Sequence, residues 1–183
     1  MANTLETTVD VALPSDIDEI VDIERRASVL VYPNTAIGLT AEAVEAWDWN
    51  EWREGYASHM DASDSELFVV RKLADGISRV AGFALITMIE RADLVVPQRR
   101  GHLHKLYVDP DRHRRGIGKT LVGAAENFTR RRGGAATELQ AVDYNPATSF
   151  YEAVGYSLEK NPGAKLIPSL GVEMNQLEYV KHH

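Results

Sequence analysis

Two glycines within a run of basic residues form the part of this sequence best suited to hold an anion. Gly116 and Gly118 leave their backbone N–H groups uncovered by side chains. A helix predicted to begin at Ile117 adds unpaired N–H groups and the positive end of a helix dipole. Mobile positive charge surrounds the glycines, on Arg112, Arg114, Arg115 and Lys119. This combination suits a pyrophosphate group bound at the beginning of a helix.

The spacing of the glycines excludes two common nucleotide-binding motifs. Gly118-Lys119-Thr120 has the form of a P-loop end, but the G-x-x-x-x-G-K-[ST] spacing is absent. The G-x-G-x-x-G pattern lacks its third glycine. A glycine-rich turn with solvated arginines is the alternative interpretation. The strand that precedes Asp109-Pro110 and the helix that follows favour the anion site.

His102 and His104 form a second group that could do chemistry. They are two positions apart on a strand predicted over 101–108, so on a regular strand they point to the same face. The pKa of an imidazole is ordinarily about 6.5, so either ring can accept a proton from an ammonium group or an intervening water. Glu90 is the second candidate for this base. Alternatively, both histidines only pack on the sheet or face solvent.

The composition excludes several classes of protein. With 183 residues the chain fits one domain, which we expect to span 1–183. The absence of cysteine excludes disulfides, thiolate metal sites and a cysteine nucleophile, and we expect no metal. A net charge of -7 argues against nucleic acid as a partner. Without an apolar run of about 18 residues or a signal peptide, we expect no membrane span and a cytoplasmic protein.

The N-terminal part of the chain predicts one strand and two helices. Residues 7–13 alternate in hydropathy and predict a strand, and Ser15 is the expected N-cap of a helix from Ile17. Thr40 is expected to cap a second helix, through about His59. This helix carries three tryptophans that either line a substrate pocket or pack the helix on the sheet, namely Trp47, Trp49 and Trp52.

The rest of the chain alternates between strands and helices. The predicted strands cover 66–72, 80–90, 101–108, 137–142, a segment from Tyr156, and 172–180, and the predicted helices run from Ile117 to the arginines at 130–132 and over 146–154. The strand over 101–108 should pair antiparallel with 80–90 and parallel with 137–142, through a right-handed crossover. We expect 161–168 to be a loop.

The basic segment resembles the central motif of the GNAT acyl-CoA N-acyltransferases. That motif reads [Q/R]-x-x-G-x-[G/A] after a strand, and this chain reads His113-Arg114-Arg115-Gly116-Ile117-Gly118. A later motif of the family, N-x-x-A-x-x-F-Y-x-x-x-G-F, is similar to the run from Ala147 to Tyr156. Tyr151 keeps the place of the motif's tyrosine. Tyr144 stands where the family often has asparagine, and Asn145 lies one residue late.

The resemblance implies an α/β fold, the GNAT fold, whose mixed and splayed central sheet has six to seven strands flanked by about four helices. Acetyl-CoA would be the co-substrate and would lie between the strands 101–108 and 137–142. An amide near Val108 would stabilise the oxyanion of the transition state. The residues expected to contact acetyl-CoA are Leu106, Tyr107, Val108, His113, Arg114, Arg115, Gly116, Ile117, Gly118, Lys119, Thr120, Asn145 and Tyr151.

The resemblance also implies direct transfer of the acetyl group to the primary amine of a small molecule. The H-x-H pair is similar to the paired histidines of arylalkylamine N-acetyltransferase, which implies a role as base or proton relay for His102 or His104. Tyr151 would donate a proton to the departing CoA thiolate. The absence of cysteine favours direct transfer over a covalent intermediate.

Two other functions stay open at this point. The acceptor could be a protein or peptide amine, or the domain could be a catalytically inactive module that only binds CoA. The histidine pair and Tyr151 favour an enzyme. Because many family members are dimers, the resemblance also makes a homodimer an expectation.

Overall fold

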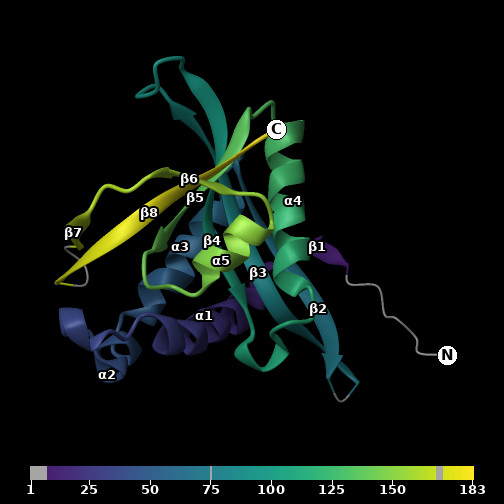
Figure 1. Ribbon diagram of the computed structural model, residues 1–183. Coiled ribbons are helices and arrows are strands. Elements are labelled where there is room, and N and C mark those ends of the chain that lie inside the picture. The colour runs from purple at the N-terminus through teal and green to yellow at the C-terminus, as the bar shows by residue number, and fades with distance from the viewer. Residues whose placement is uncertain (1–7, 75, 168–170) are drawn as a thin grey trace.

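A mixed sheet runs through the middle of the molecule, and helices cover both of its faces (Figure 1). The computed structural model describes residues 8–74, 76–167 and 171–183. Its strands are β1 (Val9–Val11), β2 (Ser65–Ala74), β3 (Ile77–Arg91), β4 (Gln98–Val108), β5 (Ala136–Val142), β6 (Ser157–Lys160), β7 (Ala164–Ile167) and β8 (Val172–His182). Its α-helices are α1 (Ile17–Val31), α2 (Ala41–Glu45), α3 (Trp49–Asp61), α4 (Ile117–Arg131) and α5 (Ala147–Ala153).

The sheet contains one parallel pair of strands, β4 and β5. The strand order is β1-β2-β3-β4-β5-β8-β6, and β7 pairs with the beginning of β8. The pairing of β4 with β5 runs only from Arg100 and Ala136 to Leu103 and Leu139. Beyond these residues the two strands diverge. The predicted mixed, splayed sheet and both predicted pairings of the strand over 101–108 are therefore confirmed.

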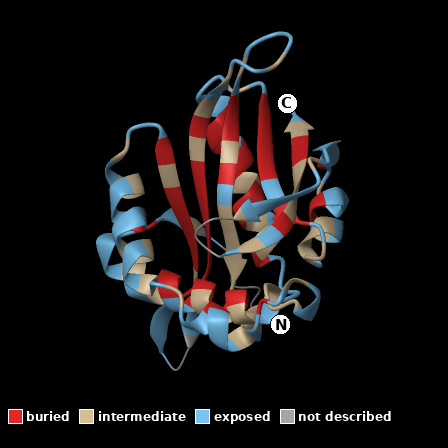
Figure 2. Ribbon diagram, turned by 90° about the vertical axis from the view of Figure 1, so that its left-hand side faces the viewer, coloured by how far each residue is buried: buried red, intermediate tan, exposed pale blue. Residues whose placement is uncertain are grey.

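Two apolar cores hold the helices on opposite faces of the sheet. Leu121 and Phe128 of α4 are buried in one core with Leu103 of β4. On the other face, the ring of Tyr56 on α3 meets Phe83 edge-on, with 5.6 Å between the centroids. Figure 2 shows the central strands buried along most of their length. Because β3 is covered on both faces, its sequence reads as a continuous apolar run.

The helix caps agree with the sequence in one case and differ in another. Thr40 caps α2, because its hydroxyl oxygen accepts the backbone N–H of Ala43 at 3.2 Å. Ser15 is not the cap of α1, so that prediction is wrong. A 3-10 turn precedes the helix, and the carboxylate of Asp16 accepts the N–H of Leu13 at 2.6 Å.

The prediction of a single helix from Thr40 to His59 is also wrong, because α2 ends at Glu45 and a separate helix, α3, begins at Trp49. The carboxylate of Asp48 accepts the N–H of Asn50 at 3.0 Å and begins α3. The sequence does not reveal this interruption, because the apolar and aromatic residues keep helical spacing on both sides of Asp48.

Two other segments differ from the sequence prediction at their ends. The strand predicted over 7–13 is only Val9–Val11, and Thr7 lies outside the described residues. The segment 161–168, expected to be a loop, contains β7; Pro168 lies outside the described residues. β7 is mostly exposed, so no alternation of apolar residues marks it.

Candidate active site

The divergence of β4 and β5 leaves the last residues of β4 with one unpaired backbone edge. The N–H of Asp109 bonds to the carbonyl of Ala81 on the β3 side, at 3.0 Å. Backbone groups alternate in direction along a strand, so the N–H groups of Val108 and Leu106 point toward the gap. These groups can bond an extended ligand that lies between the strands.

The beginning of α4 presents a second set of backbone donors. The N–H of Thr120 bonds to the Gly116 carbonyl at 3.0 Å, and the N–H groups that precede it have no acceptor within the helix. Gly116 has a φ of 77°, and Arg114, with a φ of 60°, is also left-handed. Glycine adopts this conformation freely, whereas for Arg114 it is strained, and strained residues are concentrated at binding sites.

The cations around this helix end are available to an anionic ligand. Arg114, Arg115 and Lys119 are exposed, and no carboxylate among the described residues pairs with them. His113 is also exposed, and its Nε2 donates a hydrogen bond to the Val108 carbonyl at 3.1 Å. This bond ties the basic turn to the end of β4. The site therefore fits a diphosphate beside an extended chain.

α5 closes the other side of the gap. A Cβ added to Gly118 would lie 3.3 Å from the ring of Phe150, so this glycine allows α5 to approach α4 closely. Asn145 is partly committed to the local fold, because its Oδ1 accepts the N–H of Ala147 at 2.8 Å. The ring of Tyr151 lies 6.1 Å from that of Tyr156. Burial raises the pKa of Tyr151, so its phenol is protonated and can donate at neutral pH.

β4 is not regular where the two histidines lie. Lys105 pairs with Leu85 and Leu103 pairs with Ile86, so His104 is the extra residue of a β-bulge. The rings of His102 and His104 nevertheless lie 4.5 Å apart and line the same cavity. The sequence predicted this shared face, although it gave no sign of the bulge.

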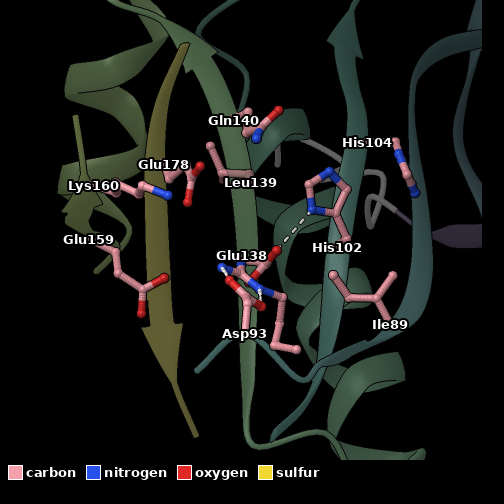
Figure 3. A pocket seen from close by; sticks show the side chains of 11 residues that line it. Ile89, Asp93, His102, His104, Glu138, Leu139, Gln140, Glu159, Lys160 and Glu178 are labelled. Atoms are coloured by element: carbon pink, nitrogen blue, oxygen red, sulfur yellow. Dashed lines mark hydrogen bonds and ion pairs between the residues drawn. The ribbon is translucent and has the colours of Figure 1, made fainter. Parts of the chain in front are cut away.

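We call this space the polar cavity; its volume is about 400 Å³. It opens where β4 and β5 separate, on the side of the sheet opposite α4. Its lining consists of Ile89, Arg91, Asp93, His102, His104, Glu138, Leu139, Gln140, Glu159, Lys160 and Glu178. Figure 3 shows the rings of His102 and His104 on one side and the carboxylates on the other. The sequence analysis missed these carboxylates, because charged residues on strands are usually solvated.

The two histidines have different surroundings. His102 Nδ1 lies 3.2 Å from Glu138 Oε1. Partial burial, together with the nearby charges of His102, His59 and Lys105, lowers the pKa of His104 to about 4. His104 is therefore neutral at pH 7. The sequence analysis also missed His59, which comes from α3 and whose ring lies 5.6 Å from that of His104.

A second space, the aromatic cavity, lies between α3 and the sheet, next to His59. Its volume is about 550 Å³. It is lined by Ala46, Trp47, Asp48, Glu51, Trp52, Gly55, Tyr56, His59, Leu85 and Lys105. Two of the three tryptophans thus form its wall, whereas Trp49 lies behind them, with its ring 5.8 Å from that of Trp47 and 5.5 Å from that of Trp52.

A buried ion pair forms the floor of the aromatic cavity. Lys105 Nζ lies 2.8 Å from Oε1 of Glu24, which is fully buried on α1. The hydroxyl of Tyr56 donates to the other oxygen of this carboxylate. The ammonium also lies 3.6 Å from the ring centroid of Trp52. Lys105, which follows the bulge residue His104, is therefore held by the carboxylate of Glu24 and by the ring of Trp52.

Glu90 is not brought to the histidines. It lies between Ile89 and Arg91, which line the polar cavity, and alternate residues of a strand point to opposite faces. Glu90 is exposed, and its Oε1 lies 3.5 Å from Arg99 Nε. The expectation that it serves as the second base is therefore not supported.

Comparison with known proteins gives the same result as the geometry. The family model described as the acetyltransferase (GNAT) family matches residues 36–156, well over half of the chain. The chain belongs to the GNAT acetyltransferase family. This GNAT protein is therefore an N-acetyltransferase that uses acetyl-CoA as its co-substrate. No curated protein is similar enough to count as a match.

Solved structures share the fold over nearly the whole chain. The PaiA N-acetyltransferase from Thermoplasma acidophilum, in complex with coenzyme A, is 19% identical with a TM-score of 0.73, and covers 98% of this chain and 100% of its own. The ribosomal-protein-S18-alanine N-acetyltransferase from Escherichia coli is 19% identical with a TM-score of 0.65, over 96% and 93%. Nourseothricin acetyltransferase is 25% identical with a TM-score of 0.52, over 66% of each chain.

Proposed function

We propose that this enzyme transfers the acetyl group of acetyl-CoA directly to the primary amine of a small molecule. One observation carries the proposal. The aromatic cavity lies between α3 and the sheet, and it includes His59, whose ring lies 5.6 Å from that of His104. A cavity of about 550 Å³ with aromatic walls suits a small molecule. A protein substrate would need an open groove at the same place.

The proposed position of acetyl-CoA follows from the unpaired backbone groups. The diphosphate would lie at the beginning of α4, on the N–H groups of Gly116, Ile117 and Gly118, with the exposed cations around it. The pantetheine arm would pair with the free edge of β4. The thioester oxygen would then accept the N–H of Val108, which stabilises the oxyanion as the amine attacks.

The proposed reaction removes two protons from the acceptor ammonium and gives one proton to the CoA thiolate. The acceptor ammonium loses a proton, directly or through water, to His102 or His104. The neutral amine nitrogen then attacks the acetyl carbon, a C–N bond forms, and the C–S bond breaks. The departing thiolate takes its proton from the Tyr151 hydroxyl, and the attacking nitrogen gives up its second proton, through water, to the tyrosinate that results. The products are an N-acetylated amine and free CoA.

The walls of the aromatic cavity indicate what kind of amine would fit. Trp47 and Trp52 lie nearly parallel, with 6.3 Å between the ring centroids, and they offer apolar surface. Asp48 and Glu51 are exposed at the same cavity and favour a cation over an anion. An apolar or aromatic primary amine that is positively charged in solution matches both features.

The test is an acceptor screen with acetyl-CoA. CoA thiol release would be measured over a panel of small primary amines and, in parallel, over peptides with free N-terminal and lysine amines. We expect turnover with small apolar amines at a kcat/KM at least tenfold above that for any peptide. If only peptides were acetylated, the small-molecule proposal would be overturned. If neither small amines nor peptides caused release of the CoA thiol, the proposed transfer to an amine would be overturned.

A further inference from the structure

The register of the sheet places a buried carboxylate beside one of the two histidines. His102 on β4 is directly opposite Glu138 on β5, in the last stretch where the two strands pair. The side chain of Glu138 is only 8% exposed, on a strand that is otherwise mostly apolar. Figure 3 shows the His102 ring turned toward this carboxylate.

We propose that Glu138 is a positioning residue that makes His102, rather than His104, the general base. The Nδ1–H of His102 donates to Glu138 Oε1 across 3.2 Å. The lone pair of Nε2 then points away from the carboxylate and can take the proton of the acceptor amine. The carboxylate also stabilises the imidazolium that results. This inference rests on the proposed function, because it assigns a role within the same site.

Two arginines keep Glu138 charged despite its burial. Burial alone would raise the pKa of Glu138, but the hydrogen bond from His102 and the charges of Arg91 and Arg100 lower it. Arg91 bonds to Glu138 Oε2, and Arg100 Nη1 lies 3.1 Å from the same oxygen. The other oxygen is the one that accepts from His102. The carboxylate is therefore held in place on one side and presented to the histidine on the other.

The arginines do not depend on Glu138 alone. Arg91 has a second carboxylate in Asp93, at 2.8 Å, and Arg100 has one in Glu159, also at 2.8 Å. Removing the charge of Glu138 therefore leaves each guanidinium with a partner. Glutamine can therefore replace Glu138 without leaving either arginine buried and unpaired.

His104 has no comparable partner among the residues that the structure describes. Its neighbours are the basic groups of His102, His59 and Lys105, and partial burial together with their charges keeps its ring neutral. The other charged groups that line the polar cavity are Arg91 and Asp93 from β3 and the segment after it, Glu159 and Lys160 from β6, and Glu178 from β8. Arg100 of β4 lies behind them and contacts Glu138 and Glu159. His104 is thus suited to relay a proton but not to retain one.

The test compares Glu138→Gln with a matched control, Glu126→Gln. Glu126 on α4 is also a buried carboxylate, 7% exposed and paired with Lys181 and Arg130, but it lies far from the histidines. We expect Glu138→Gln to lower kcat/KM about tenfold and to move the acidic limb of the pH profile down by about one unit, because the charge that favours the imidazolium is lost. Glu126→Gln should leave that limb in place. An unmoved limb in Glu138→Gln would overturn the proposal.

Two further measurements keep the proposal testable if a variant is unstable or no acceptor is found. In a His102→Asn background, Glu138→Gln should cost nothing further, and an additive loss would show that Glu138 does not act through His102. In the wild-type protein without substrate, nitrogen NMR at high pH should show the His102 proton on Nδ1. A proton on Nε2 would overturn the positioning role while leaving the acetyl-transfer proposal intact.

Discussion

The two ends of the crevice between β4 and β5 are built in different ways. At the beginning of α4, backbone N–H groups and a left-handed glycine form the site, and all of it comes from one short segment. At the bulge of β4, side chains from α1, α3, β3, β4 and β5 meet around the histidines. The first end suits a ligand part that never changes, the diphosphate, and the second suits an acceptor that differs between enzymes.

This difference predicts that substitutions at the two ends change different kinetic constants. Changes in backbone geometry at α4 should raise the KM for acetyl-CoA and leave the acceptor KM alone. Changes of side chain around the bulge should act on kcat or on the acceptor KM. A substitution at the beginning of α4 that changed the acceptor KM, or one at the bulge that changed only the KM for acetyl-CoA, would contradict this assignment.

Tyr151→Phe should have the largest effect. The ring would keep its contacts with Tyr156 and Tyr179, but the proton for the thiolate would be lost, so kcat should fall about 10²-fold. The KM for acetyl-CoA should change little. Steady-state thiol release checks both constants, and full turnover in this variant would remove the acid role from Tyr151.

Trp52→Ala should raise the acceptor KM about tenfold, because one wall of the aromatic cavity is lost. It should also lower the free energy of unfolding by about 2 kcal/mol through lost packing. Trp49→Ala is the matched control, since Trp49 packs against the same core without lining the cavity. If both variants changed the acceptor KM equally, the loss would come from helix packing rather than from a cavity wall.

Gly116→Ala tests the end of the crevice at which α4 begins. An added Cβ would meet nothing within 4 Å, so the effect would come only from the φ of 77°. The strain of about 1 kcal/mol should shift the turn and raise the KM for acetyl-CoA about fivefold. Gly123→Ala in the middle of α4, where the Cβ also meets nothing, should leave this KM unchanged. An unchanged KM in Gly116→Ala would show that the turn geometry is not needed for binding.

The smallest effect should be a pH dependence of stability at His104. Its pKa is lowered to about 4 from 6.5. Between these pH values the unfolded chain binds a proton at this residue and the folded chain does not, so stability falls as the pH drops. His104→Asn should remove part of this fall, less than about 1 kcal/mol, because solvent in the cavity screens the charge. Urea unfolding at pH 7 and pH 5 measures it, and an equal fall in both proteins would contradict the assignment.

The same division explains what could be predicted from the sequence. Gly116, Gly118 and the cations around them are neighbours in the sequence, so their spacing and the strand before them are enough to predict that this turn begins a helix and carries exposed cations. The parallel pairing of β4 and β5 followed from the strand–helix–strand order. These features depend on neighbours within a few residues or on one crossover.

The side-chain end could not be predicted because it depends on contacts between distant segments. Glu138 is a single charged residue in an apolar strand, and only the register with β4 shows that it meets His102. The pair of Glu24 with Lys105 joins residues 81 positions apart. The bulge at His104 also has no glycine or proline to mark it. Glu90, predicted as the second candidate for the base, lies on the face of β3 opposite the polar cavity.

The most direct test of the central claim is a crystal structure with bound acetyl-CoA. We expect diphosphate oxygens about 3 Å from the N–H groups of Gly116 to Gly118, and the thioester oxygen at a similar distance from the N–H of Val108, with the acetyl group turned toward His102. A diphosphate held elsewhere by side chains, or an acetyl group outside the gap between β4 and β5, would contradict the account.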